Sequence, residues 1–300
     1  MSFNNEDNQM DALFIGHAGL GDSLNMIGAL RFMSYYYKNV YFVVKEKNLL
    51  QIEPFFKDTN IICLSYEYKD MWSEVIDILT FVREFDKKNA DIFMLGDFRK
   101  YYIGRIVNKS YINGVNNFKR SIYEGIEEIK FDHDMIVLND YYFLYRFYDM
   151  IGMHLNIYFE YFDFGDSKNS EIYYNKIKHY KRIIFTQTKT SENICLSINN
   201  LINKYINDSE CIIVCNDENI YEKYDYLIEN KDEGNIKKEL VKPYILGCMI
   251  DYKDLIYNSN EIYILDSSFT SVILPSLKTG KLKAEIVRII NRNRINEVEL

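Results

Sequence analysis

A glycine-rich loop near the amino terminus holds the first residues that could do chemistry. The stretch FIGHAGLGDSLNMIGALRFM (Phe14–Met33) contains Gly16, Gly19 and Gly21, followed directly by an acid, Asp22. Glycines permit a tight strand-to-helix turn, with positive φ angles and close approach of another group. A carboxylate at the end of such a turn would repel a phosphate. We therefore interpret Asp22 as a group that can take a proton from a hydroxyl.

Other interpretations of this loop stay open. A dinucleotide fingerprint has the form G-x-G-x-x-G, but Leu24 stands in place of the third glycine. Glu46 ends the second expected strand, roughly where a ribose-binding acid belongs. Alternatively, Asp22 and Ser23 cap the helix, which is worth on the order of 1 kcal/mol. His17, beside the turn, is either an acceptor-positioning residue or a structural hydrogen-bonded histidine.

A second candidate lies near the carboxyl terminus, in YILDSSFTSVILPSL. A strand is expected to end at Asp266 and to turn at Ser267 and Ser268, with a helix beginning near residues 269–271. The first N–H groups and the positive dipole end of that helix face the turn. Small hydroxyl residues there suit a diphosphate, and an ordinary capped helix is the alternative.

The acids and histidines give little support for a metal site. Asp132 and Asp134 have the D-x-D spacing with which a GT-A glycosyltransferase holds a divalent metal, although a solvated loop explains them as well. The four histidines show no zinc-ligand spacing, and no serine lies in a G-x-S-x-G elbow. We therefore expect neither a metal nor a cofactor.

Alternating strands and helices must position these loops, and this alternation predicts parallel, doubly wound sheets. The pattern pauses in the polar stretch 165–171 and then restarts, so we expect two Rossmann-like domains, residues 1–160 and 161–300. The expected strands are residues 12–17, 40–46, 60–66, 90–96, 111–115, 182–188, 211–217 and 261–266; the expected helices include 23–37, 72–85, 197–206 and 221–230. The apolar face of the helix 72–85 is predicted to consist of Trp72, Val75, Ile76, Leu79, Val82 and Phe85.

Composition limits the class of protein. The net charge of −8 argues against a general nucleic-acid binder, which needs a basic face. Five scattered cysteines fit reduced thiols, and the polar, acidic first residues do not resemble a signal peptide. No apolar run approaches the roughly 20 residues of a membrane span. We expect a cytoplasmic protein without a transmembrane segment.

Several segments together resemble the heptosyltransferase-like glycosyltransferases (family nine). GHAGLGDSLNMIGALRFM resembles their opening strand, Gly-Asp turn and "AL" helix. ADIFMLGDFRKYYIGRIVNKSYINGVNNFKRSIYE is similar to a later strand, helix and glycine segment, with Gly114 in the glycine's place. HDMIVLNDYYFLYRFYDMIGM resembles the helix that closes their first domain, ending at Gly152. IIFTQTKTSEN resembles their donor loop, and LDSSFTSVILPSL their late D-T-G-x-x-H element.

This resemblance implies an α/β GT-B fold, in which two Rossmann-like domains face each other across a cleft, and metal-independent, inverting transfer. A sugar would move from a nucleoside-diphosphate sugar to a glycan or glycoconjugate acceptor, with Asp22 as general base and Lys189 neutralising donor phosphate. The residues expected around the donor's ribose and diphosphate are Asp266, Ser267, Ser268, Thr270 and Ser271; those expected in the acceptor-side loop are His17, Gly19, Gly21 and Ser23.

The chain also departs from the family pattern. Ser271 stands where the family usually has histidine, and Ser268 where it has glycine, so donor recognition is expected to differ. We therefore infer neither heptose nor lipopolysaccharide as a substrate. Two alternatives remain: an NAD(P)-binding Rossmann oxidoreductase, and a non-catalytic binding protein with the GT-B fold.

Overall fold

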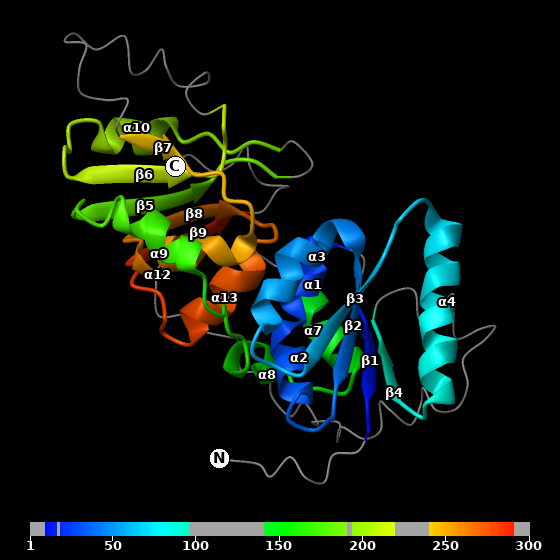
Figure 1. Ribbon diagram of the computed structural model, residues 1–300. Coiled ribbons are helices and arrows are strands. Elements are labelled where there is room, and N and C mark those ends of the chain that lie inside the picture. Colours follow the sequence, from blue (N-terminus) through cyan, green and yellow to red (C-terminus); the bar gives the residue numbers. More distant parts are fainter. Residues whose placement is uncertain (1–9, 17–18, 96–140, 191–193, 220–239, 291–300) are drawn as a thin grey trace. The chain divides into compact units, whose positions relative to one another are not determined.

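The computed structural model describes residues 10–16, 19–95, 141–190, 194–219 and 240–290 (Figure 1). These residues form two compact units, the first ending at Gly165 and the second beginning at Asp166. Each unit contains one fully parallel β-sheet. His17, Gly114, Asp132, Asp134 and the expected elements at 111–115 and 221–230 lie outside the described residues.

The first unit is built on a four-stranded sheet with the order β3-β2-β1-β4. Phe14, in the middle of β1, is in register with Phe42 on β2 and Phe93 on β4, and its ring packs against both of theirs. The strands are β1 (Ala12–Ile15), β2 (Val40–Lys45), β3 (Ile61–Tyr66) and β4 (Asp91–Met94).

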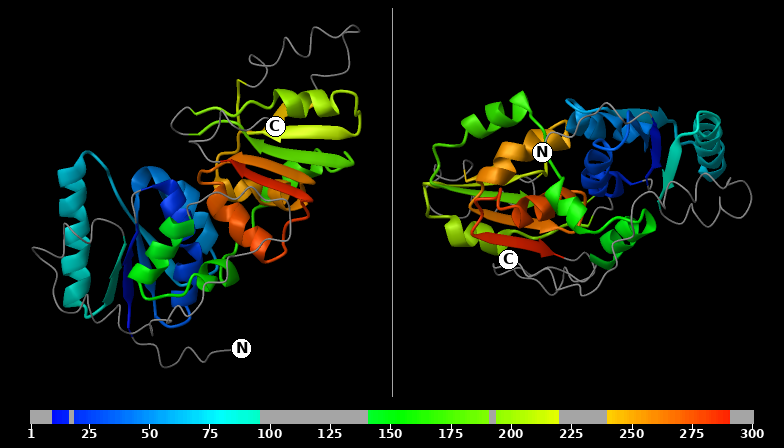
Figure 2. Two further views of the ribbon diagram at one scale, coloured as in Figure 1. Left: turned by 180° about the vertical axis from the view of Figure 1, so that it is seen from behind. Right: turned by 90° about the horizontal axis from the view of Figure 1, so that it is seen from below.

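Helices cover both faces of this sheet (Figures 1 and 2). The long helix α4 packs on one face, where Ile78, Leu79, Val82 and Phe85 join the buried core. The other helices of the unit lie on the opposite side of the sheet in these views. The helical elements are α1 (Leu20–Asn25), α2 (Ile27–Met33), α3 (Glu46–Ile52), η2 (Glu53–Phe56), α4 (Met71–Lys87), α7 (Tyr141–Met150) and α8 (Asn156–Glu160).

Two residues of the predicted apolar face of α4 were wrong. Trp72 is 70% exposed and Ile76 is 62% exposed, whereas Ile78, which was not assigned to that face, is buried. The helix begins immediately before Trp72, with a capping box in which Asp70 and Ser73 exchange hydrogen bonds. Glu74 in its first turn is buried together with Ile78, Val82 and Phe85, so the buried face of the helix is rotated away from Trp72 and Ile76.

The second unit is built on a five-stranded sheet with the order β7-β6-β5-β8-β9. The outer strand β9 was not expected from the sequence, because its segment alternates charged and apolar residues only briefly. The strands are β5 (Arg182–Gln187), β6 (Cys211–Cys215), β7 (Val241–Pro243), β8 (Glu261–Leu265) and β9 (Ile286–Ile290).

One helix, α10, packs its apolar residues with Ile184, Ile213 and Tyr263 on one face of this sheet. On the other face, the ring of Phe185 contacts those of Tyr252 and Phe269. Helices on both faces complete a second doubly wound layer. The helical elements are α9 (Lys168–Asn175), α10 (Asn199–Tyr205), η3 (Met249–Tyr252), α12 (Lys253–Asn258) and α13 (Thr270–Lys278).

The polar stretch near residue 165 is where α9 begins. Ser167 caps this helix by accepting from the Ser170 amide, and its hydroxyl donates to the Asp251 carboxylate at 2.5 Å. Ser170 is fully buried, and its hydroxyl accepts from the amide of Asp254 in α12. Serine hydroxyls thus join α9 to the η3–α12 segment, which the weak apolar periodicity of this stretch did not predict.

The predicted α/β class is confirmed: two parallel sheets, each with helices on both faces, follow one another along the chain. Among the described residues, no helix is both long enough and apolar enough to cross a membrane.

Candidate active-site loops

The glycine-rich loop follows β1, the strand at which the strand order of the first sheet reverses. The chain moves outward from β1 to β2 and β3, and then returns to pair β4 on the other side of β1. In doubly wound sheets, ligands bind beyond the carboxyl ends of the strands at such a switch point. Asp22 and Ser23 therefore lie on the element that follows the switch-point strand.

Gly16 and Gly19 in this loop are each approached closely by a side chain. Among the described glycines, positive φ angles occur at Gly152, Gly165 and Gly280. Gly19 has φ −83°, so the expectation of positive angles in this turn was wrong. A Cβ atom on Gly19 would come 2.7 Å from Oδ2 of Asp22, which shows that the carboxylate lies directly over this residue.

Asp22 lies in the first turn of α1 and is half-buried. Gly19 is the N-cap residue of the helix, so neither Asp22 nor Ser23 occupies the cap position. The Ser23 hydroxyl instead donates to the Gly19 carbonyl at 3.0 Å. A carboxylate in the first turn lies at the positive end of the helix dipole, which is a favourable place for an acidic side chain.

The helix expected at residues 23–37 is broken at Met26 into α1 and α2. The buried Tyr148 hydroxyl stabilises the break by donating to the Asn25 carbonyl at 2.9 Å and accepting from the Ala29 amide at 3.2 Å. Burial raises the pKa of Tyr148 and keeps its donor proton in place. The break changes the direction of the chain one turn after Asp22, and nothing in the local sequence indicates it.

In the second unit, the two predicted donor loops follow adjacent strands at the switch point of the second sheet. Thr188 and Lys189 follow β5, and the turn 266–269 follows β8, its neighbour. The chain winds outward from β5 to β6 and β7, then returns to β8 and β9. The topology therefore brings together at one edge two segments that lie almost 80 residues apart in the sequence.

A buried amide connects these loops directly. Gln187, the last residue of β5, is 3% exposed. Its Oε1 accepts a hydrogen bond from the Ser267 hydroxyl at 2.5 Å, and its Nε2 donates to the Lys189 carbonyl at 3.2 Å. Gln187 was not among the predicted site residues, although a polar residue ending an apolar strand is a signal that could have identified it.

The turn after β8 is organised by hydroxyl groups. The Ser267 amide donates to Oγ1 of Thr270, and the Ser267 hydroxyl accepts from the amide of Phe269, the N-cap residue of α13. The helix begins at Thr270, as predicted. Asp266 and Ser268 are half-buried, whereas Ser271 is only 3% exposed. Ser271 thus lies in the interior of the first turn, in contrast to the other predicted donor residues.

Two further polar residues at this edge follow β6. The Asn216 Oδ1 atom accepts from the Thr188 amide at 3.3 Å, and Asp217, which is buried, accepts from the Thr188 hydroxyl at 3.5 Å. The Asn219 amide also donates to Asp217. The Asn-Asp pair after an apolar strand was expected only as a strand end, and it supports the loop that contains Lys189.

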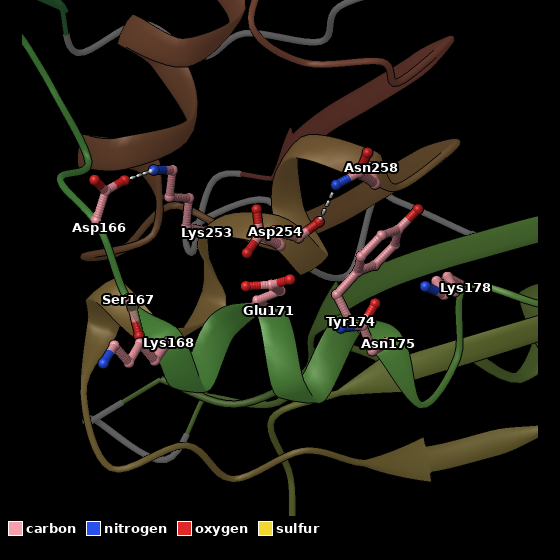
Figure 3. Close-up of a pocket in the computed structure, with 10 residues that line it drawn as sticks. All are labelled: Asp166, Ser167, Lys168, Glu171, Tyr174, Asn175, Lys178, Lys253, Asp254 and Asn258. Carbon is pink, nitrogen blue, oxygen red and sulfur yellow. Dashed lines mark hydrogen bonds and ion pairs between the residues drawn. The ribbon is translucent and has the colours of Figure 1, made fainter.

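A separate polar pocket of about 460 Å³ lies between α9 and α12 and contains none of the predicted site residues (Figure 3). Two contacts cross its wall: Lys253 forms an ion pair with Asp166 at 2.9 Å, and the Asn258 amide donates to the Asp254 carbonyl at 2.8 Å. The pocket's mixed charges do not select one class of ligand. Its lining residues are Asp166, Ser167, Lys168, Glu171, Tyr174, Asn175, Lys178, Lys253, Asp254 and Asn258.

No group of His, Cys, Asp and Glu that could hold a metal ion occurs in the part of the chain that the structure describes. Of the predicted site residues, His17 alone lies outside that part. Gly19, Gly21, Asp22 and Ser23 lie together on the first unit. Lys189 and residues 266–271 come together on the second unit.

Comparison with known proteins supports the predicted fold. No protein-family model and no curated protein sequence matches the chain. Among solved structures, a family 9 glycosyl transferase from Veillonella parvula matches with a TM-score of 0.53 and 12% identity, covering 97% of this chain and 88% of that one. Escherichia coli ADP-heptose lps heptosyltransferase II matches with a TM-score of 0.55 and 12% identity, covering 94% and 90%. The chain therefore has the GT-B fold of family 9 glycosyltransferases over nearly its full length, and the predicted resemblance is confirmed at the level of fold.

Proposed function

We propose that this protein is a glycosyltransferase that moves a sugar from a nucleoside-diphosphate sugar to an acceptor hydroxyl. A single observation carries the proposal. In a chain with the GT-B fold, the two loops expected to bind the donor lie on adjacent strands at a switch point and are joined by one buried amide. Because a fold alone does not define an activity, the proposal depends on the residues of the two donor loops and on Gln187.

The second unit binds the donor. Lys189 and the amino-terminal end of α13 are the positive groups at this edge, and they stabilise the charge that develops on the leaving diphosphate. Small hydroxyl residues around the turn leave room for phosphate oxygens. The name of the similar E. coli enzyme includes ADP-heptose, so ADP and its sugars are the first donors to test, while the sugar itself stays open.

The first unit acts on the acceptor, with Asp22 as the general base. As the acceptor oxygen forms a bond to the anomeric carbon, its proton passes to the Asp22 carboxylate and the bond from that carbon to the diphosphate breaks. Attack from the face opposite the leaving group inverts the anomeric configuration. This step requires no redox partner, and the positive groups of the second unit take the role that a metal ion would have.

The first test is a thermal-shift panel of ADP, GDP, UDP, dTDP, CMP, several of their sugars and NAD(P), measured in EDTA and repeated with Mg²⁺. A shift with one nucleoside diphosphate in EDTA supports the proposal and identifies the donor class. A shift that requires Mg²⁺ contradicts metal independence. A shift with NAD(P) alone favours the oxidoreductase. If no compound shifts the melting temperature, a non-catalytic binding protein is favoured.

Asp22→Asn then tests the base in a transfer assay with the donor so identified. We expect kcat to fall by roughly 10²–10⁴-fold, because general-base catalysis is lost. Asp70→Asn is the matched control: Asp70 is also a carboxylate at the start of a helix, and asparagine caps about as well as aspartate. Equal activity of Asp22→Asn and wild type would exclude Asp22 as the base.

A further inference from the structure

Gln187 occupies an unusual position for an amide side chain. It ends the central strand of the second sheet, in register with Ile264 on β8, and is almost fully buried. Burying an amide without partners is costly, so its hydrogen bonds must be satisfied within the protein. Both ends of this amide bind loops that the proposed function assigns to the donor.

The partners determine which way the amide points. The Lys189 carbonyl can only accept a hydrogen bond, so the amide nitrogen must face it. With the amide nitrogen facing Lys189, Oε1 faces Ser267, and because Oε1 can only accept, the Ser267 hydroxyl donates its proton to it. A continuous series of hydrogen bonds thus runs from the Lys189 loop through Gln187 to the first turn of α13.

We infer that Gln187 is a positioning residue that holds the Lys189 loop and the Ser267 turn in one fixed arrangement for the donor diphosphate. The inference rests on the proposed function. Holding both loops requires one side chain with both a hydrogen-bond donor and an acceptor, which glutamine provides. Glutamate lacks the donor, and methionine, of similar shape, lacks both. Preorganised loops bind more tightly because less ordering is required on binding.

The experiment compares Gln187→Met, Gln187→Glu and Ser267→Ala with a control, Thr186→Val. Thr186 is fully buried in the same strand, and its hydroxyl donates only a long, 3.5 Å bond to the Val214 carbonyl within the sheet. Calorimetric titrations with ADP, GDP, UDP and dTDP measure binding. Amide exchange, followed by NMR without ligand, measures loop order at Leu196, which donates to the Thr188 carbonyl, and at Phe269.

We expect Gln187→Met to accelerate exchange at both amides and to weaken binding of the preferred nucleoside diphosphate about tenfold. Gln187→Glu should accelerate exchange mainly at Leu196, and Ser267→Ala mainly at Phe269. Thr186→Val should change neither the affinity nor this pattern. Ser267→Ala keeps the test valid if the substitutions at the buried Gln187 prevent folding.

The outcomes separate this inference from the proposed function. If wild type binds a nucleoside diphosphate and Gln187→Met binds it equally well, the positioning role is overturned while the proposed function stands. If exchange in Gln187→Met matches that in Thr186→Val, the coupling of the loops is likewise overturned. If wild type binds none of the four nucleotides, the proposed donor site fails, and the positioning role fails with it.

Discussion

The two edges of the second sheet bury different kinds of polar group, a charged carboxylate at one edge and a neutral amide at the other. At the amino edge, the carboxylate of Glu261 is 1% exposed and accepts hydrogen bonds from Tyr205, from Tyr263 at 2.6 Å and from Arg182 at 2.8 Å. At the carboxyl edge, the buried group is the neutral amide of Gln187, which binds one hydroxyl and one carbonyl.

This difference has a physical consequence. Burial acts to raise the pKa of Glu261, but the hydroxyls of Tyr205 and Tyr263 and the nearby cations outweigh it, and the pKa is lowered. The charge at the amino edge is thus fully compensated within the protein. The neutral contacts at the carboxyl edge fix the loops without adding a charge that would repel a phosphate. We expect the amino edge to control stability and the carboxyl edge to control binding.

Removing the buried carboxylate should have the largest effect on stability. Glu261→Leu leaves two tyrosine hydroxyls without their acceptor and Arg182 without its ion pair, so we expect the free energy of unfolding to fall by about 3 kcal/mol. Chemical denaturation measures this loss. Glu210→Gln is the control, because its ion pair with Lys181 is exposed and its removal should cause no measurable change. If Glu261→Leu lowers the free energy of unfolding no more than the control does, the amino edge does not control stability.

Acid should remove the same contribution. Because the pKa of Glu261 is lower in the folded state than in the unfolded state, its stabilisation is fully present above the unfolded value of about 4.3 and disappears as the pH falls through the folded value. The difference in unfolding free energy between wild type and Glu261→Leu should therefore shrink below about pH 4. A difference that stays constant down to pH 2 would be inconsistent with a charged Glu261.

A substitution at the carboxyl edge should lower the free energy of unfolding less than the loss of Glu261 does. Ser267→Ala removes two hydrogen bonds of this hydroxyl, one donated to Gln187 and one accepted from the Phe269 amide, and we expect a loss of about 1–2 kcal/mol in the free energy of unfolding, measured by denaturation in urea. A loss as large as that of Glu261→Leu would remove the distinction between the two edges. This variant keeps the two bonds between Ser267 and Thr270 that use the Ser267 carbonyl and amide, so its effect on nucleotide affinity can be measured on folded protein.

The smallest effect is expected at the rim of the amino edge. Lys204 lies 3.7 Å from the Glu261 carboxylate, but its side chain is 53% exposed and its attraction is screened by water. Lys204→Met should therefore lower the free energy of unfolding by only about 0.3 kcal/mol. Repeating the measurement in 1 M NaCl provides the control, since salt should remove even this difference. A larger, salt-independent loss would place Lys204 within the buried network.

Much of the fold was accessible from the sequence because its signals are local. Apolar runs flanked by polar turns predicted every strand of the first sheet that the structure describes, and the serine turn marked the start of α13, whereas α1 begins three residues before the predicted Ser23. The alternation of these elements led to two doubly wound sheets, and short motifs led to the GT-B fold that the solved structures share. These features depend on residues a few positions apart, for which pattern and chemistry are sufficient.

Other features depended on partners far away in the chain. Tyr148 stabilises the break between α1 and α2 from more than 100 residues away, and the packing of α4 on its sheet decides which side of that helix is buried. Gln187 became a candidate only when β5 and β8 paired and brought Ser267 to its amide. The sequence by itself determined which residue types stand at the strand ends. The tertiary structure alone decided which of them meet, because hydrogen bonds between distant segments follow strand order and not chemistry within any one segment.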